Sequence, residues 1–371
     1  MDTKLFHTDD NEIAEAGEIL RNGGLVAFPT ETVYGLGASA FDSDAAKKIY
    51  DAKGRPSDNP LIVHICDKGQ IKDIAEEIPE SAKKVIDNFM PGPVTIILKK
   101  KSVVPNDVTA GLDTVAIRFP LHETAQKLIK AAGVPIAAPS ANLSGKPSPT
   151  KAKHVVKDMT GRIDAIIDGG ECNVGVESTI VDFTGEKPVI LRPGGVTYDD
   201  LKGIGLDVEI DKNILHSIAA DEVPKCPGMK YKHYAPKADL TLVEPANVAD
   251  ARKTGEAVAM TQEQVEQMVK TVWKLAKEKI DAGCKVGIIC TDESRSRYPQ
   301  GEVRSIGARK SQESVAHNLY ALLREFDDLK VDYIFSESFT QDHLGQAIMN
   351  RLSKAAGYQI YNCLLYTSDA A

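Results

Sequence analysis

Residues Gly23–His64 read GGLVAFPTETVYGLGASAFDSDAAKKIYDAKGRPSDNPLIVH and hold two apolar runs on either side of a polar segment. The runs Leu25–Phe28 and Leu61–Ile65 predict two strands, and the residues before Lys53 predict a helix between them. The polar segment is dense in Thr, Glu, Tyr, Lys, Arg and His. This density between two strands indicates a site for a small polar or anionic ligand.

Short apolar runs alternate with helical patterns to about residue 210 and predict an α/β arrangement. The predicted strands are Leu25–Phe28, Leu61–Ile65, Val94–Leu98, Val115–Phe119, Ile136–Ala138, Ala165–Asp168, Ser178–Asp182 and Val189–Arg192. The predicted helices are Glu12–Asn22, Ala45–Ala52, Ser81–Phe89, Glu123–Ala132 and Lys151–Met159. The helix Ser81–Phe89 has an apolar face that should lie on a sheet. Thr150 is expected to cap the helix that begins at Lys151.

A proline-containing stretch without periodicity, Ser217–Ala238, predicts a linker to a second part of the chain. Beyond it, a smaller Rossmann-like α/β domain is predicted. Its predicted strands are Leu240–Val243, Ala257–Met260, Val286–Ile289 and Tyr333–Ser336. Its predicted helices are Gln262–Ala282 and Gln312–Leu329. No glycine fingerprint follows its first strand, so we expect no dinucleotide there.

The bulk composition predicts a soluble protein of two domains. The chain has 371 residues, against roughly 100–200 residues per domain. A net charge of −8 argues against a dedicated nucleic-acid binder, although a local basic pocket stays open. The six cysteines have no metal-ligand spacing, so we expect reduced thiols and no protein-held metal. No signal-peptide core and no apolar run of about 20 residues is present, which predicts a cytoplasmic protein and no membrane.

Lys53 and Arg55 are the first candidates for chemistry. Two cations two residues apart, before the constrained Pro56, can bind a polyphosphate. The alternative is that they only compensate the dipole at the end of a helix. Ser140, Asn142 and the residues up to Ser148 offer several donors, but an ordinary turn would also use them.

Arg118 lies inside an apolar run, where a charge needs an anionic partner. That partner is either a ligand or a structural ion pair. His64, in a predicted strand, is either a site residue or a core histidine. The linker residues Tyr231 and Tyr234 indicate either a lid or a rigid spacer.

Eight segments stand in an order that resembles one family. They are PTETVYGLG, KGRPSDNPLIVH, PGPVTIIL, TAGLDTVAIRFP, APSANLSGKPSPT, GVESTIVD, LRPGG and PGMKYKHYAP, from Pro29 to Pro236. Together they are similar to the Sua5/YrdC/YwlC family, the threonylcarbamoyl-AMP synthases. The resemblance continues more weakly to about Ala356, and the ending LLYTSDAA does not continue it.

The resemblance implies a YrdC-like twisted mixed sheet with helices around a concave site, plus a Rossmann-like Sua5 C-terminal domain. We expect the YrdC-like catalytic domain at 1–212, a linker or lid at 213–238, the Sua5 domain at 239–362, and a non-native or disordered tail at 363–371. Lys53 and Arg55 would be catalytic. The family's ATP contacts match Arg55, Asn59, Thr114, Ser140, Asn142, Ser148, Arg192 and Tyr234. Its threonine contacts match Thr32, His64, Arg118, Ala138 and Ser178, with Arg118 facing the carboxylate.

The implied reaction joins L-threonine, bicarbonate or CO₂, and ATP, with Mg²⁺ carried by the nucleotide, into threonylcarbamoyl-AMP and pyrophosphate. The product would pass to the machinery that modifies adenosine 37 of tRNA, and direct tRNA binding is left open. The sequence does not identify a general base, and His64 is a candidate only because of the usual pKa of histidine. The alternatives are an RNA-binding module of the same fold, a carbamoyl-transfer enzyme of hydrogenase maturation, and a ligand-sensing second domain. The carbamoyl-transfer enzymes of hydrogenase maturation normally have acylphosphatase and zinc-finger modules upstream, which this sequence lacks.

Overall fold

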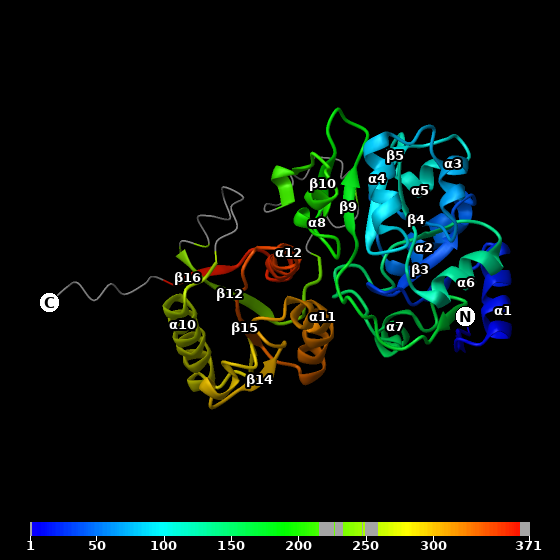
Figure 1. Ribbon diagram of the computed structural model, residues 1–371. Helices are drawn as coiled ribbons and strands as arrows, with labels where there is room; N and C mark the ends of the chain where they lie inside the picture. The colour runs from blue at the N-terminus through cyan, green and yellow to red at the C-terminus, as the bar shows by residue number, and fades with distance from the viewer. Residues whose placement is uncertain (1, 215–225, 227–232, 247, 249–258, 364–371) are drawn as a thin grey trace. The chain divides into compact units, whose positions relative to one another are not determined.

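The structure is a computed structural model that describes residues 2–214, 226, 233–246, 248 and 259–363. The chain divides into two compact units, Met1–Tyr231 and Lys232–Ala371 (Figure 1). All predicted site residues except Tyr234 belong to the first unit.

The first unit is built on a mixed sheet with the strand order β1-β8-β2-β3-β7-β4-β6-β5-β9-β10-β11. Its strands are β1 (Lys4–Phe6), β2 (Val26–Phe28), β3 (Gly35–Ser39), β4 (Ile62–His64), β5 (Val94–Lys99), β6 (Thr114–Arg118), β7 (Ile136–Ala138), β8 (Ala165–Ile167), β9 (Thr179–Asp182), β10 (Val189–Arg192) and β11 (Glu209–Ile210). Its α-helices are α1 (Asp10–Arg21), α2 (Ser43–Lys53), α3 (Ile71–Ile74), α4 (Glu80–Phe89), α5 (Asn106–Thr109), α6 (Glu123–Ala132), α7 (Ala152–Met159) and α8 (Tyr198–Gly203).

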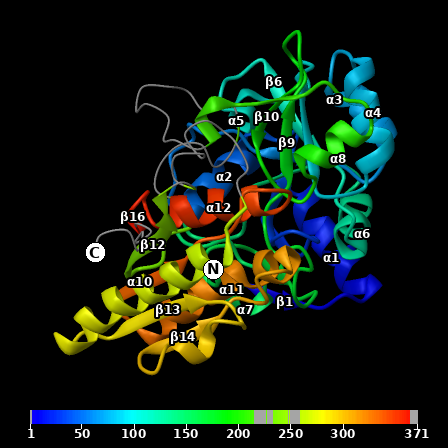
Figure 2. The same ribbon diagram turned by 60° about the vertical axis from the view of Figure 1, so that its left-hand side comes forward.

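Helices cover both faces of this sheet because successive strand residues point to opposite sides. Val26 and Phe28 of β2 pack into the core formed with α1 and α6, which lie side by side (Figure 1, Figure 2). Leu25 and Ala27 pack into the core on the other face. A continuous apolar run therefore forms a strand that is buried on both sides.

Each strand predicted in the first unit overlaps an observed strand, and each predicted helix overlaps an observed helix. The apolar face of α4 is buried through Ala82, Val85 and Ile86, as predicted. The capping role of Thr150 is wrong. α7 begins at Ala152 after Lys151 without a side-chain cap, while the Thr150 N–H points to His154 Nδ1 and its Oγ1 has no hydrogen-bond partner among the described residues.

The second unit has a parallel sheet with the order β14-β13-β15-β12-β16. Its strands are β12 (Asp239–Pro245), β13 (Val286–Cys290), β14 (Glu302–Ser305), β15 (Tyr333–Glu337) and β16 (Ile360–Cys363). The helices are α10 (Gln262–Asp281), α11 (Gln312–Leu329) and α12 (Gly345–Ala355). The predicted Rossmann-like α/β arrangement is confirmed.

The sequence analysis did not predict β14, β16 or α12, and two of its predictions in this unit also differ from the structure. Of the predicted strand Ala257–Met260, residues 257 and 258 lie outside the described residues and Met260 is not in a strand. Cys363, predicted as the start of a tail, ends β16 and pairs with Pro245, whereas residues 364–371 lie outside the described residues. Within the described ranges, no helix is long and apolar enough to cross a membrane.

Candidate active site

Lys53 connects the end of α2 to the loop that follows β7. Asp42 caps the start of α2, and Gly54 ends the helix in the left-handed conformation with a φ of 62°. The buried Lys53 Nζ donates hydrogen bonds to the carbonyl oxygens of Ser140 at 2.5 Å and Asn142 at 2.7 Å. Two segments that the sequence analysis treated separately are therefore joined by one ammonium group.

The Ser140–Asn142 loop is held by its own side chains as well. Ser140 Oγ donates to Asn142 Oδ1 at 2.5 Å. Asn142 Nδ2 in turn donates to the carbonyl oxygens of Leu143 and Lys146, both at 2.9 Å. These contacts fix the hydroxyl and amide groups in place, as recognition of a polar ligand requires.

Arg55 and Asn59 lie in the segment between α2 and β4. Arg55 Nη2 donates to the Asn59 carbonyl at 2.7 Å, and its guanidinium lies 5.6 Å from the centre of the Tyr50 ring. The Asn59 side chain is fully buried, yet neither its amide nitrogen nor its oxygen has a hydrogen-bond partner in the described part of the chain. Buried amides are normally paired, so this group is suited to a ligand.

The predicted threonine contacts meet where β4, β6, β7 and β5 adjoin. His64 of β4 pairs with Arg118 of β6, and Ile62 of β4 pairs with Ala138 of β7. Arg118 is also opposite Thr95 of β5. Thr32 is buried in the turn between β2 and β3, with its Oγ1 2.9 Å from Thr30 Oγ1. The register thus brings together residues that are far apart in sequence.

Arg118 has the anionic partner that its burial predicted. Its Nη2 lies 2.8 Å from Glu31 Oε1, and the two side chains are only 5% and 6% exposed. Of the two interpretations left open, a protein ion pair is therefore present. Glu31 lies in the motif PTETVYGLG, but no role was predicted for it from the sequence.

Ser178 and Arg192 connect the predicted threonine contacts to β9 and β10. Arg192 donates to the Ser178 carbonyl from Nε at 3.1 Å and from Nη2 at 3.0 Å, and to Ser178 Oγ at 3.1 Å. Ser178 Oγ lies 2.8 Å from Thr95 Oγ1. Gly194 allows this packing, because a Cβ there would lie 2.3 Å from both Glu177 O and Thr179 N.

The remaining predicted ATP contacts differ in their surroundings. Ser148 Oγ donates to Glu177 Oε1 at 2.6 Å in a buried position. Thr114 begins β6, and the pairing of Ile62 with Ala116 places it beside the segment that precedes β4. Tyr234 belongs to the second unit, where its ring lies 5.3 Å from that of Tyr320.

The pKa of two buried groups limits the acid–base chemistry of the site. Burial, and then the positive charge of Arg118, lower the pKa of His64 to about 3. Such a weak base is poorly suited to deprotonate an ammonium group, so the structure does not support His64 as the general base. Burial raises the pKa of the Cys172 thiol to about 12, so it is not an activated nucleophile.

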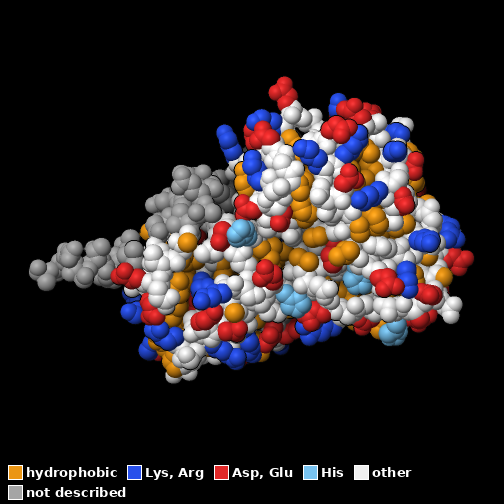
Figure 3. All heavy atoms as spheres, in the orientation of Figure 1, with side chains coloured by type: hydrophobic (Ala, Val, Ile, Leu, Met, Phe, Trp, Pro, Cys, Tyr) orange, Lys and Arg blue, Asp and Glu red, His pale blue; other side chains and the backbone are white. Residues whose placement is uncertain are grey.

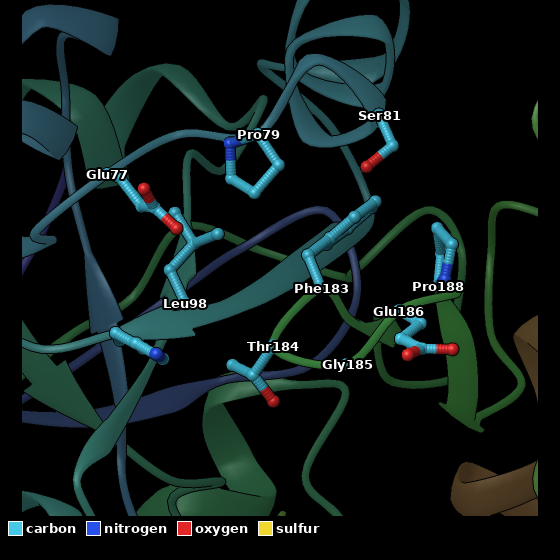
Figure 4. A pocket seen from close by; sticks show the side chains of 10 residues that line it. Glu77, Pro79, Ser81, Leu98, Phe183, Thr184, Gly185, Glu186 and Pro188 are labelled. Atoms are coloured by element: carbon cyan, nitrogen blue, oxygen red, sulfur yellow. The ribbon is translucent and has the colours of Figure 1, made fainter.

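A separate cavity of about 200 Å³ lies beside β5 and the loop after β9 (Figure 4). Glu77, Thr184 and Glu186 line it, and none of its lining residues is a predicted site residue. In the described part of the chain, no group of three or more His, Cys, Asp or Glu residues could hold a metal ion.

Three residues of the site were missed in the sequence: Glu31, Thr95 and Glu177. Each is polar, buried and bonded to a predicted site residue, namely Arg118, Ser178 and Ser148 respectively. All three lie within the quoted motifs. The available signal for Thr95 was its place inside an apolar run, whereas Glu31 and Glu177 stand among polar residues and gave no such signal.

Comparison with known proteins gives matches to two family models and to several relatives. A family model described as "Telomere recombination" matches residues 18–194, and one described as "Threonylcarbamoyl-AMP synthase, C-terminal domain" matches residues 196–357. The chain is 47% identical to threonylcarbamoyl-AMP synthase of Bacillus subtilis, over 96% of each chain. It is 46% identical to that of Pyrococcus abyssi, over 94% of this chain and 95% of the relative.

A crystal structure of P. abyssi Sua5 complexed with L-threonine has a TM-score of 0.87 to this chain. The two are 42% identical, and the match covers 98% of this chain and 99% of the other. The twisted mixed sheet and the Sua5 C-terminal domain that the sequence implied are thereby confirmed. The chain belongs to the threonylcarbamoyl-AMP synthase family, with both the YrdC-like and the Sua5 C-terminal domains.

Proposed function

We propose that the chain acts as an L-threonylcarbamoyladenylate synthase, a nucleotidyltransferase that uses L-threonine, bicarbonate or CO₂, and ATP. Its membership of the family supports this activity. The observation that carries the proposal is the contact between the two groups of candidate residues. Arg192, a candidate ATP contact, bonds directly to Ser178, a candidate threonine contact. On this assignment, one residue pair would adjoin both substrates.

We assign the nucleotide to the region around α2 and the loop after β7. Lys53, Arg55 and Arg192 supply positive charge for the phosphates, while Ser140 and Asn142 supply neutral polar groups. Asn59, Thr114 and Ser148 complete this end of the site, and Tyr234 is a further candidate ATP contact. Mg²⁺ would arrive with the nucleotide, whose phosphate oxygens bind it.

We assign L-threonine to the buried strand ends, with Arg118 at its carboxylate and Thr32, His64, Ala138 and Ser178 around it. The ammonium group of threonine first loses a proton to water. The neutral nitrogen then attacks the carbon of CO₂, one C–O π bond opens, and a second proton passes from nitrogen to water, which leaves an N-carboxylate. An oxygen of that carboxylate then attacks the α-phosphorus, the bond to the bridging oxygen breaks, and pyrophosphate leaves. The substrate provides its own nucleophile, so the protein contributes position and charge compensation.

The N-carboxylate is labile in water, and burial of the strand ends would protect it. We propose the segment 213–238 as a lid, most of which lies outside the described residues. The product would be passed to the machinery that transfers the threonylcarbamoyl group to adenosine 37 of tRNA. We also propose a cytoplasmic location, which the six free thiols support.

Release of pyrophosphate from ATP tests the proposal, with L-threonine and bicarbonate each present or omitted. We expect release to require both substrates. Release that depends on neither would contradict the proposal, and salt-dependent RNA binding without nucleotide turnover would favour the RNA-binding alternative.

A further inference from the structure

Glu31 is held rigidly in the turn between β2 and β3. Thr30 Oγ1 donates to the Val33 carbonyl at 2.6 Å and lies 3.2 Å and 3.3 Å from the N–H nitrogens of Thr32 and Val33. The Glu31 carbonyl accepts a hydrogen bond from Val174 N at 2.8 Å. The backbone on either side of Glu31 is thus fixed, and with it the direction of the side chain.

The ion pair between Glu31 and Arg118 leaves polar atoms of both residues unsatisfied. Glu31 Oε2 and Arg118 Nε have no hydrogen-bond partner among the described residues, while Glu31 Oε1 and Arg118 Nη2 lie 2.8 Å apart as an ion pair without hydrogen-bond geometry. Both side chains are more than nine-tenths buried. Unsatisfied buried charges are costly, so the pair is suited to a ligand that brings both a donor and an acceptor.

The neighbouring titratable groups do not neutralise Glu31. Burial lowers the pKa of His122 and raises that of Cys172, and the charge of Glu31 acts on both groups. His122 and Cys172 are therefore uncharged at neutral pH, as is His64. The positive charge that faces Glu31 among these groups comes from Arg118 alone.

We propose that Glu31 binds the α-ammonium group of L-threonine while Arg118 binds its α-carboxylate. This rests on the proposed function and adds a residue to the amino-acid site. An α-amino acid carries one donor group and one acceptor group on the same carbon. These match the unsatisfied oxygens of Glu31 and the unsatisfied nitrogens of Arg118. Glu31 thereby fixes the position of the nitrogen, which attacks CO₂ only after the bound ammonium group has lost a proton to water.

The test uses calorimetry on the full chain with two ligands, L-threonine and 3-hydroxybutyrate, which lacks the amine. In Glu31→Gln, we expect affinity for L-threonine to fall by about 30-fold, as for loss of a charge-assisted hydrogen bond. Affinity for 3-hydroxybutyrate should stay within about twofold, because Arg118 still binds its carboxylate. Glu80→Gln, whose side chain is 85% exposed, is the control and should bind both ligands normally.

An equal loss for both ligands in Glu31→Gln would mean that Glu31 acts only through Arg118, and would overturn the proposal. Unchanged binding of both would overturn it as well. Should the variant not fold, wild-type protein still decides the matter, because equal affinity for L-threonine and 3-hydroxybutyrate excludes an ammonium site. Absence of L-threonine binding to folded wild-type protein would reject the proposed function itself.

Discussion

Lys53 shows how one side chain can have a structural and a chemical role. Its ammonium group binds the carbonyl oxygens of Ser140 and Asn142 and so fixes the loop after β7. The same positive charge lies beside the polar groups of that loop, where we place the phosphates of ATP. Helix-dipole compensation, the alternative left open by the sequence, does not account for hydrogen bonds to a distant loop.

We predict that Lys53→Ala lowers pyrophosphate release by at least about 100-fold, because phosphate positioning and charge are both lost. Stability should fall by about 1–3 kcal/mol, because two buried carbonyl oxygens lose their donor. Lys48→Ala on the same helix is the matched control, since Lys48 Nζ also donates to a backbone carbonyl, that of Gly23. Near-normal turnover of Lys53→Ala in a folded protein would contradict the phosphate assignment.

His64 gives a prediction about pH. Its pKa is about 3 in the folded chain and near 6.5 when unfolded. Below pH 6.5 the unfolded chain therefore binds a proton that the folded chain does not, and stability falls by roughly 1.4 kcal/mol per pH unit. The free energy of unfolding, measured between pH 7 and pH 5, should show this loss of stability in the wild-type protein. The loss should be absent in His64→Gln. An imidazole that titrates near 6.5 by NMR would contradict it.

At this scale the sequence predicted that Arg118 needs an anion but did not identify Glu31. The two residues meet because the turn after β2 reaches the end of β6, although β3, β7 and β4 lie between these two strands in the sheet. Such a contact depends on the order of strands in the sheet, which local patterns do not contain.

The strands of the first unit place the candidate site residues at or near their ends. β4, β6 and β7 place His64, Arg118 and Ala138 together, and the turn containing Gly194 packs against the residues before β9. Apolar runs predicted most of these strands. β3 was missed because Gly35 and Gly37 make its sequence resemble a turn. β1 was missed because two of its three residues are exposed and it contains no continuous apolar run.

We predict that Gly194→Ala destabilises the protein by about 1–3 kcal/mol and reduces turnover. The added Cβ would lie 2.5 Å from Ser178 C and would displace the residue that bonds Arg192. Gly203→Ala, where a Cβ meets nothing within 4 Å, is the control. Thermal unfolding and pyrophosphate release measure both effects, and equal behaviour of the two variants would contradict this packing argument.

The whole molecule consists of two units, each with its own core. The sequence predicted this division from the linker, but α12 was missed because its buried face includes Asn350, Arg351 and Lys354. Polar residues at buried positions hide the apolar periodicity on which the prediction depends. Figure 3 shows basic and acidic side chains interspersed over the visible face, in keeping with the modest net charge of −8.

We predict that a chain ended near Ala220 stays folded but forms threonylcarbamoyl-AMP at least about tenfold more slowly. The core residues of the first unit's two main clusters all precede this position, so folding should persist. Loss of the rest of the proposed lid should expose the labile intermediate to water. Circular dichroism checks the fold, and full activity of the shortened chain would reject the lid.

The most direct test of the central claim identifies the product. The full chain is incubated with ATP, L-threonine and ¹³C-bicarbonate, and the adenylates are separated and analysed by mass spectrometry. Our account predicts threonylcarbamoyl-AMP with one ¹³C atom, formed together with pyrophosphate and absent when L-threonine is omitted. An adenylate without the label, or hydrolysis of ATP without any such adduct, would contradict it.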